Sequence, residues 1–400
     1  MNEVRFTELL EDIVDNRGKS VPTSETGTAL IATNCIKEDS LYPTFENVRF
    51  VDDERMETWF RGHPIPGDIL FVCKGSPGRV VMVPEEVNFC IAQDMVSLRP
   101  DATLVYPKYL FAALRSNLVR KRIESMHVGS LIPHFKKGDF DQLMIPLPEM
   151  KVQVSIGDQY FAISERIQSG ISSINLLERL GAALLEQSMA NDELTTDITV
   201  GDVLGIMETG SRPKGGATSK GVVSLGAESV KSAGITGNRE TKFVPVEFAS
   251  QMKRGHLADG DILVYKDGAA LSTSNSIVSA FGFGFPTNEA VVNEHVFRLQ
   301  GNEFVSQGLL YWLLRSPRID AEIRMRVTGA AQPGLNSENL RSVPLPSKLH
   351  ELKRVLGSQL DQMLELMLKL GSQNNKLILL RDSLLNLQIA ARISNRGASI

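Results

Sequence analysis

Two stretches of the chain repeat apolar residues at helical spacing. From Val152 and again from Leu349, apolar side chains recur every three or four positions, which predicts one long helix in each stretch. With about 40 residues at 1.5 Å rise per residue, each helix would be roughly 60 Å long. The apolar positions are Ile156, Tyr160, Ile163, Ile167, Ile171, Ile174, Leu177 and Leu184 in the first stretch, and Leu349, Leu352, Leu356, Met363, Met367, Leu370, Leu377, Leu384 and Ala391 in the second.

The sequence before each of these stretches follows one common pattern. Three anchors recur in the same order, at offsets of 193 to 200 residues, and we therefore predict an internal duplication. Each copy holds a buried strand, a short amphipathic helix and a closing proline segment. The anchors are GDIL at 67–70 and 260–263, the helix ending in Arg-Ser at 115–116 and 315–316, and the segment from Gly to Pro-Leu-Pro at 129–148 and 329–346.

The connections between these parts predict the architecture. Only about eight residues (ANDELTTD, from Ala190) join the first long helix to the second copy, and the second long helix follows its copy directly. Because each apolar stripe needs a partner, the two helices should pair antiparallel. We predict an α+β fold with two similar α/β domains at opposite ends of an antiparallel coiled coil, related by an approximate two-fold axis. The predicted bounds are 1–148 and 193–346 for the domains, and 149–192 and 347–394 for the helices.

Composition predicts a soluble chain that stays in the cytoplasm. Hydrophobic residues make up 42% and charged residues 22%, and no apolar run is long enough to span a membrane. The N-terminal segment MNEVRFTELLEDIVDN mixes acids with apolar residues, unlike a signal peptide. The three cysteines, Cys35, Cys73 and Cys90, are scattered and odd in number, so we interpret them as buried small hydrophobic residues.

Sequence motifs of catalysis are missing. The chain contains no G-x-x-x-x-G-K-[ST], H-E-x-x-H or G-x-S-x-G string, and no N-P-P-[YF] string of adenine methyltransferases. Glu149 and Lys151 have the spacing of a nuclease acid-lysine pair, but they stand at a helix start, where a capping role is expected. We predict no catalytic residues, no bound metal and no cofactor for this chain.

Charge points to local patches rather than to overall attraction for nucleic acid. The net charge is −4 at pH 7. Basic residues nevertheless cluster in both copies, at 108–137 and 315–326, and such clusters form either solvated helix faces or contacts with phosphates. Arg and Lys also match guanine edges, and Asn and Gln match adenine edges. The predicted DNA-binding residues are Arg17, Lys19, Lys74, Arg120, Lys121, Arg122, Ser130, His134 and Lys136 in the first copy, and Arg212, Lys214, Lys220, Lys266, Arg324, Arg326, Gln332 and Asn336 in the second.

Each half of the chain has GDIL in its middle and is closed by Pro-Leu-Pro and a long helix. This arrangement of two variable halves resembles that of the specificity subunits of Type I restriction-modification systems, along nearly the whole chain. The resemblance implies a target recognition domain in each half that reads one part of a split double-stranded DNA target. It also implies that the helices act as a spacer and dock two methyltransferase subunits, which would bind S-adenosylmethionine. Separate restriction subunits would translocate and cut DNA in phage defence.

Two other classes of function are compatible with the same sequence features. A coiled-coil scaffold that joins two protein-binding domains would need no DNA, and the net charge of −4 slightly favours it. A restriction enzyme that carries its own catalytic site is disfavoured, because the methyltransferase and nuclease motifs are missing.

Overall fold

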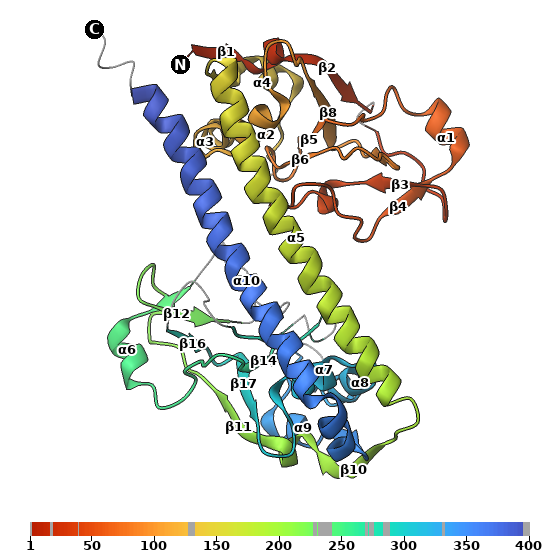
Figure 1. Cartoon of the computed structure of the whole chain (residues 1–400), viewed down its shortest axis with the longest axis vertical. Coiled ribbons are helices and arrows are strands. Elements are labelled where there is room, and N and C mark those ends of the chain that lie inside the picture. The colour runs from red at the N-terminus through yellow and green to blue at the C-terminus, as the bar shows by residue number, and fades with distance from the viewer. Residues whose placement is uncertain are drawn as a thin grey trace. The chain divides into compact units, whose positions relative to one another are not determined.

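The computed structural model describes residues 2–16, 19–38, 40–126, 133–226, 230, 242–268, 271, 276–282, 289–329 and 333–394, without the side chains of residues 137 and 392–394. The chain forms two compact units. Unit 1 consists of residues 1–168 and 377–400, and unit 2 of residues 169–376. Both long helices, α5 (Met150–Ser188) and α10 (Leu349–Ser394), contribute one part to each unit (Figure 1).

The globular domain of unit 1, the first domain, is built on a four-stranded antiparallel sheet in the order β2-β8-β5-β6. Strand β5 is the apolar run of the GDIL string, and all four of its side chains are buried. Ile69 and Phe71 pack towards helix α2, whereas Leu70 and Val72 pack towards a second sheet, so the strand has no solvent face. The bounds are β2 (Leu10–Asp15), β8 (Met95–Pro100), β5 (Ile69–Val72), β6 (Val80–Met82) and α2 (Pro107–Arg115).

The second sheet of the first domain has three strands in the order β4-β3-β7, with β3 antiparallel to β4 and parallel to β7. A two-stranded pair, β1 with β9, joins the N-terminal segment to the Pro-Leu-Pro segment. The bounds are β4 (Arg49–Val51), β3 (Thr28–Ile31), β7 (Phe89–Ile91), β1 (Asn2–Arg5), β9 (Met144–Leu147), η1 (Phe6–Leu9), η2 (Thr33–Cys35), α1 (Asp53–Thr58), α3 (Asn117–Ser125) and α4 (Lys137–Gln142).

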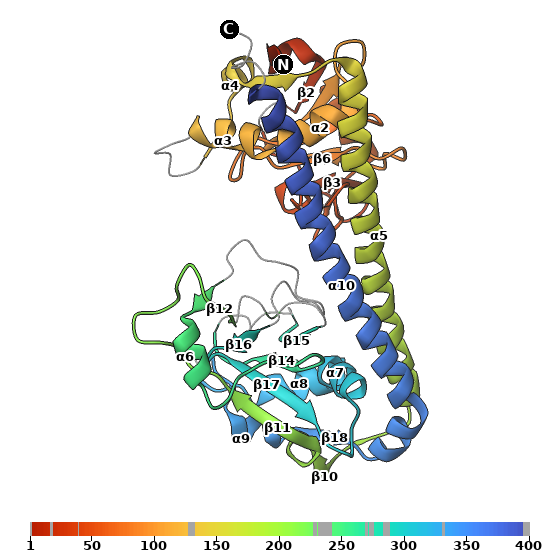
Figure 2. The same cartoon turned by 60° about the vertical axis from the view of Figure 1, so that its left-hand side comes forward.

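The globular domain of unit 2, the second domain, repeats these elements (Figures 1 and 2). Its sheets have the orders β11-β17-β14-β15 and β13-β12-β16, and its terminal pair is β10 with β18. Each strand pairs in the same direction as its counterpart, which confirms the predicted internal repeat. The bounds are β10 (Leu194–Thr199), η3 (Val200–Val203), β11 (Leu204–Thr209), β12 (Val222–Leu225), β13 (Phe243–Val244), α6 (Val246–Gln251), β14 (Ile262–Tyr265), β15 (Val278–Ala280), β16 (Ala290–Val292), β17 (Val296–Gly301), α7 (Gln307–Arg315), α8 (Pro317–Met325), α9 (Ser337–Arg341) and β18 (Pro344–Pro346).

The long helices pair antiparallel within unit 1. Gln388 on α10 donates a hydrogen bond to Gln159 on α5 (2.8 Å), and Arg381 donates to Ser164 (3.4 Å), so residue numbers rise along one helix as they fall along the other. In unit 2 the end of α5 and the start of α10 share one apolar core. A polar residue interrupts this seam at Asn374, which is 3% exposed and lies against Gly170.

The predicted α+β class, with two similar domains and two paired long helices, is confirmed. The compact units divide each long helix, whereas the predicted bounds separate helices from domains, and these bounds stay a prediction. In the part of the chain that the structure describes, every helix is too short or too polar to cross a membrane.

Gly181 on α5 tests how closely the second domain approaches this helix. A Cβ atom at Gly181 would lie 2.3 Å from Cε2 of Trp312 on α7, whose indole N–H donates to the carbonyl of Glu178 (3.1 Å). We expect Gly181→Ala to lower the free energy of unfolding by about 1–3 kcal/mol through overpacking, measured by denaturant titration. Gly138→Ala is the control, because a Cβ atom there meets nothing within 4 Å, and alanine should stabilise helix α4 by up to about 1 kcal/mol. Equal effects of the two substitutions would contradict this close approach.

Candidate functional site

The aspartate of the first GDIL string is buried at the start of β5. Asp68 is 1% exposed. Its carboxylate accepts hydrogen bonds from the backbone N–H of Ile65 (3.1 Å), the hydroxyl of Ser97 (2.9 Å) and two nitrogens of Arg99 (3.1 Å each). A buried carboxylate is tolerated only when it is paired in this way. Residues of β8 therefore hold the turn before β5 against the sheet.

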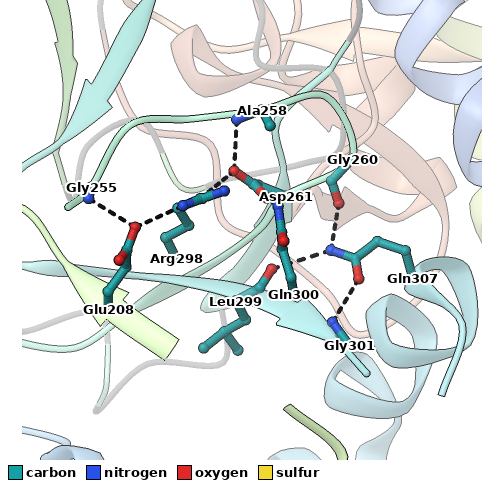
Figure 3. A network of polar contacts seen from close by, with 10 residues as sticks. All are labelled: Glu208, Gly255, Ala258, Gly260, Asp261, Arg298, Leu299, Gln300, Gly301 and Gln307. Atoms are coloured by element: carbon teal, nitrogen blue, oxygen red, sulfur yellow. Dashed lines mark hydrogen bonds and ion pairs between the residues drawn. The ribbon is translucent and has the colours of Figure 1, made fainter. Parts of the chain in front are cut away.

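The aspartate of the second GDIL string has the same role but different partners (Figure 3). Asp261 is fully buried and accepts hydrogen bonds from the N–H of Ala258 (2.7 Å), the side chain of Gln300 (2.6 Å) and Nε of Arg298. Arg298 also pairs with Glu208 on β11 (2.7 Å). Burial alone would lower the pKa of Arg298, but its hydrogen bonds to Asp261 and Glu208 raise it.

The arginine beside the buried aspartate occupies a different strand position in the two domains. The register of the strand pairs gives the equivalent residues, which are Ser97 with Arg298, Arg99 with Gln300, and Val14 with Glu208. The arginine has thus moved by two residues on the same face of its strand. In the second domain it meets a carboxylate where the first domain has an apolar valine.

The arginine at the end of the short amphipathic helix also points into the fold. Arg115 on α2 is 5% exposed and donates to the carbonyl of Val80 on β6 (2.7 Å). Arg315 on α7 donates to the carbonyl of Val278 on β15 (2.7 Å), and burial lowers the pKa of Arg315 to about 10. The repeated Arg-Ser anchor therefore reflects a contact inside each domain rather than a surface for phosphates.

One edge of the main sheet gathers predicted DNA-binding residues in the first domain. The loop after β5 pairs with the segment before α4 through a bridge between Lys74 and His134. Lys74, His134 and Lys136 are all exposed there. Strand β2 is antiparallel to β8 and therefore ends at the same edge, where exposed Lys19 follows it. We call this region the first edge.

The second domain has the same backbone arrangement with different side chains, and we call it the second edge. The bridge here joins Asp267 to Gly334, where the first domain has a lysine and a histidine. Asn336 stands before α9, as Lys136 stands before α4, and its side chain caps the helix by accepting from the N–H of Asn339 (2.7 Å). Its amide N–H groups donate no hydrogen bond to any residue that the structure describes. The predicted residue Lys266 precedes the bridge by one position.

Ion pairs organise the second edge. Arg212, which follows β11, pairs with Glu294 (3.0 Å), and Lys266 pairs with Asp267 (3.4 Å). His295 contacts the same Asp267 carboxylate (3.1 Å). Sequence reasoning missed Glu294 and His295, although their position directly before β17 was a usable signal, since loops at this edge carry the other candidates.

A cavity of about 420 Å³ opens beside these residues. The predicted residues Lys266 and Asn336 line it, together with Glu208, Arg254 and Phe297. Glu208 connects the cavity to the buried network around Asp261, because its Oε1 accepts from Arg298, which also donates to Asp261. The same oxygen accepts from the N–H of Gly255 (2.8 Å). We call this the β11 cavity.

Part of the chain matches a known protein family, and the fold of the chain matches a solved structure. The family described as "Type I restriction modification DNA specificity domain" matches residues 25–176. A crystal structure of a Type I restriction-modification system S subunit from M. genitalium matches with a TM-score of 0.52 and 17% identity, over 97% of this chain and 95% of that chain. Residues 25–176 therefore match the Type I restriction-modification DNA specificity domain family, and the chain shares its fold with that S subunit.

Two further solved structures match this chain with lower TM-scores. The HsdS subunit from Thermoanaerobacter tengcongensis has a TM-score of 0.37 at 15% identity, over 97% of this chain and 96% of that chain. A structure described by complex assembly and conformational transition of the Type I R-M system has a TM-score of 0.39 at 14% identity, over 97% of both chains. Only the M. genitalium structure, with the highest of these scores, supports the fold. No curated protein matches the chain.

The basic helices carry cations of two kinds. Arg122 on α3, Arg324 on α8 and Arg326 directly after α8 are held by carboxylates of their own domains. Arg120 and Lys121 on α3 form no ion pair with any residue that the structure describes, so they are better placed to meet phosphates. Contact with DNA stays a prediction for all five.

Five predicted residues remain, of which the structure describes two. Lys214 and Lys220 are exposed between β11 and β12. Arg17, Ser130 and Gln332 lie outside the described residues.

Potential metal ligands are dispersed over the described residues, and the three thiols are buried. Among the described residues, no group of three or more His, Cys, Asp or Glu side chains is arranged to hold a metal ion. Cys35, Cys73 and Cys90 are free and buried, which confirms their interpretation from the sequence. Burial raises the pKa of both Cys73 and Cys90 to about 12.

The burial of Asp68 and Asp261 predicts how their replacement changes the free energy of unfolding. Asp261→Ala should lower the free energy of unfolding by about 3–5 kcal/mol, because it leaves the largely buried Arg298 beside an empty site. Asp68→Ala should cost less, since the side chain of Arg99 is 22% exposed and that of Arg298 only 11%. Denaturant titration of the full chain measures both.

The control for these variants is Asp158→Ala, which removes an exposed pair with Lys108 and should change stability by at most about 1 kcal/mol. If Asp261→Ala behaved like this control, the buried network would not hold the second domain together.

Proposed function

We propose that this chain reads a split double-stranded DNA target for a Type I restriction-modification complex, one part of the target with each domain. Residues 1–148 and 193–346 act as the two target recognition domains. Residues 149–192 and 347–394 act as the spacer that fixes the gap between the two parts. The chain itself contributes recognition, and catalysis belongs to its partner subunits in the cytoplasm.

The observation that carries this proposal is the contrast between scaffold and edge. The two domains share strand order, strand direction and the buried aspartate, yet equivalent edge positions differ. Lys74 stands where the second domain has Asp267, and Lys136 stands where it has Asn336. A constant scaffold with different polar side chains at one edge suits two readers of different base sequences, because hydrogen-bonding groups specify bases.

Exposed residues on the long helices support the docking of two methyltransferase subunits, which would bind S-adenosylmethionine. Restriction subunits would dock through these methyltransferase subunits. Leu176 and Leu180 on α5 are 59% and 47% exposed, and Leu379 and Leu387 on α10 are 61% and 66% exposed. Large apolar side chains on an exposed helix face suit a protein partner.

Replacing the second domain should change one part of the target only. We expect a chain whose residues 198–343 come from a relative with another specificity to methylate a target with one new part, the other part and the gap being unchanged. The reason is that each domain has its own core and its own edge. Methylome sequencing of cells that express the chimera with its methyltransferase partner measures this outcome. A change in both parts would refute independent reading.

Removing cations from the first edge should weaken the salt dependence of DNA binding. Each phosphate contact contributes about −0.9 to the slope of log affinity against log salt, so Lys74→Ala with Lys136→Ala should flatten that slope by up to about 1.8. Titrations of labelled target DNA at several salt concentrations give the slope.

The matched control is Lys108→Ala with Lys151→Ala, which removes the same charge from the same unit. Lys108 follows β8, which is antiparallel to β5 and therefore ends away from the first edge, and Lys151 lies at the start of α5, so the slope should not change. Identical slopes for both double variants would remove the first edge from the DNA interface, and absence of any DNA binding would favour a protein scaffold.

A further inference from the structure

The β11 cavity contains a carboxylate at a position that is apolar in the first domain. There Val14 takes the place of Glu208, and the strand arginine, Arg99, pairs instead with the more exposed Asp12 (3.5 Å). Half-buried ion pairs seldom add stability over apolar side chains. Charged residues at positions where a related domain has apolar ones indicate a functional role.

The network holds the Glu208 carboxylate in place as an acceptor. Its Oε1 receives both the Arg298 guanidinium (2.7 Å) and the Gly255 N–H (2.8 Å), and Oε2 has no hydrogen bond within the described part of the chain. Burial would raise the pKa of Glu208, but these hydrogen bonds lower it below its ordinary value. The group is therefore ionised at neutral pH and can only accept hydrogen bonds.

The other walls of the β11 cavity define a ligand with three parts. Glu208 suits an amino group, and the partly exposed Met207 gives the cavity an apolar surface against which a flat ring can lie. Arg254 adds a positive charge that suits a phosphate, and Lys266, which pairs with Asp267 (3.4 Å), lines the same cavity. A volume of about 420 Å³ lies within the range of about 300–1,000 Å³ for small-ligand pockets. One nucleotide with an amino-bearing base combines all three parts.

We propose that the β11 cavity binds one nucleotide of the half-target read by the second domain, turned out of the base stack, with its exocyclic amino group on Glu208 and its phosphate near Arg254 and Lys266. The inference rests on the proposed function. A base that stays stacked presents only its edge, whereas Glu208 forms part of a recessed wall, so the base must leave the stack to reach it. A free nucleotide has the same chemistry and is the alternative source.

An abasic scan tests displacement of the base. In complexes of the full chain with its methyltransferase subunits, each base opposite the second half-target is replaced in turn by an abasic site. Displacing an unpaired base costs less, so affinity should rise several-fold at the position that enters the cavity. Glu208→Gln should abolish this rise and weaken binding of the intact target about tenfold, because the amide places a donor beside an amino group. The gain at the methylated adenine, which enters the methyltransferase, should persist.

Two further variants separate binding from folding. Thr209→Val removes a hydroxyl from the cavity wall with little change of shape and should reduce the gain at the same position. Asp12→Asn is the control, since it removes a carboxylate charge beside Arg99 of the first domain and should leave the scan unchanged.

The outcomes distinguish this inference from the proposed function. If the complex methylates a split target but no position responds to Glu208→Gln, the inference fails and the function stands. The scan could stay flat while calorimetry shows that adenosine or cytidine monophosphate binds the full chain and that Glu208→Gln abolishes this binding. The cavity would then bind a free nucleotide, and the proposal that its ligand comes from the DNA target would be overturned. Loss of all sequence-specific methylation by the unmodified complex would overturn the function itself.

Discussion

A buried carboxylate at the start of one central strand is the constraint on which each domain depends. Asp68 and Asp261 have almost no exposure, so each needs a cation and several hydrogen-bond donors in the interior. Those donors come from the turn before the strand and from the neighbouring strand β8 or β17. The aspartate therefore fixes the turn, the register of the central strands and, through them, the place where the loops of the sheet edge emerge.

The two domains satisfy this constraint in different ways, and the difference separates fold from recognition. Arg99 pairs with the buried aspartate of the first domain. In the second domain Arg298 pairs with the aspartate, from a strand position that differs by two residues. Because either arrangement neutralises the aspartate, the polar residues around the edge can vary while the scaffold persists. In the second domain the displaced arginine also fixes Glu208 in the wall of a cavity.

The sequence predicted the long helices, the repeat and the paired architecture, because apolar periodicity and repeated strings record burial directly. It suggested both Lys74 and Lys266 as DNA-binding residues, and backbone pairing makes Asp267, not Lys266, the counterpart of Lys74. The roles of Arg99 and Arg298 could not be predicted either, since strand register is set by tertiary contacts. Arg115 and Arg315 resembled surface cations because charge alone does not reveal that a side chain is buried.

The central claim is that two copies of one domain read two parts of one target. Methylome sequencing of cells that express this chain with its methyltransferase partner, compared with cells that express the partner alone, tests it most directly. We predict methylated adenines in a target of two short specified parts separated by a gap of fixed length, present only with the chain. Methylation of one uninterrupted sequence, or the same methylation without the chain, would contradict the account.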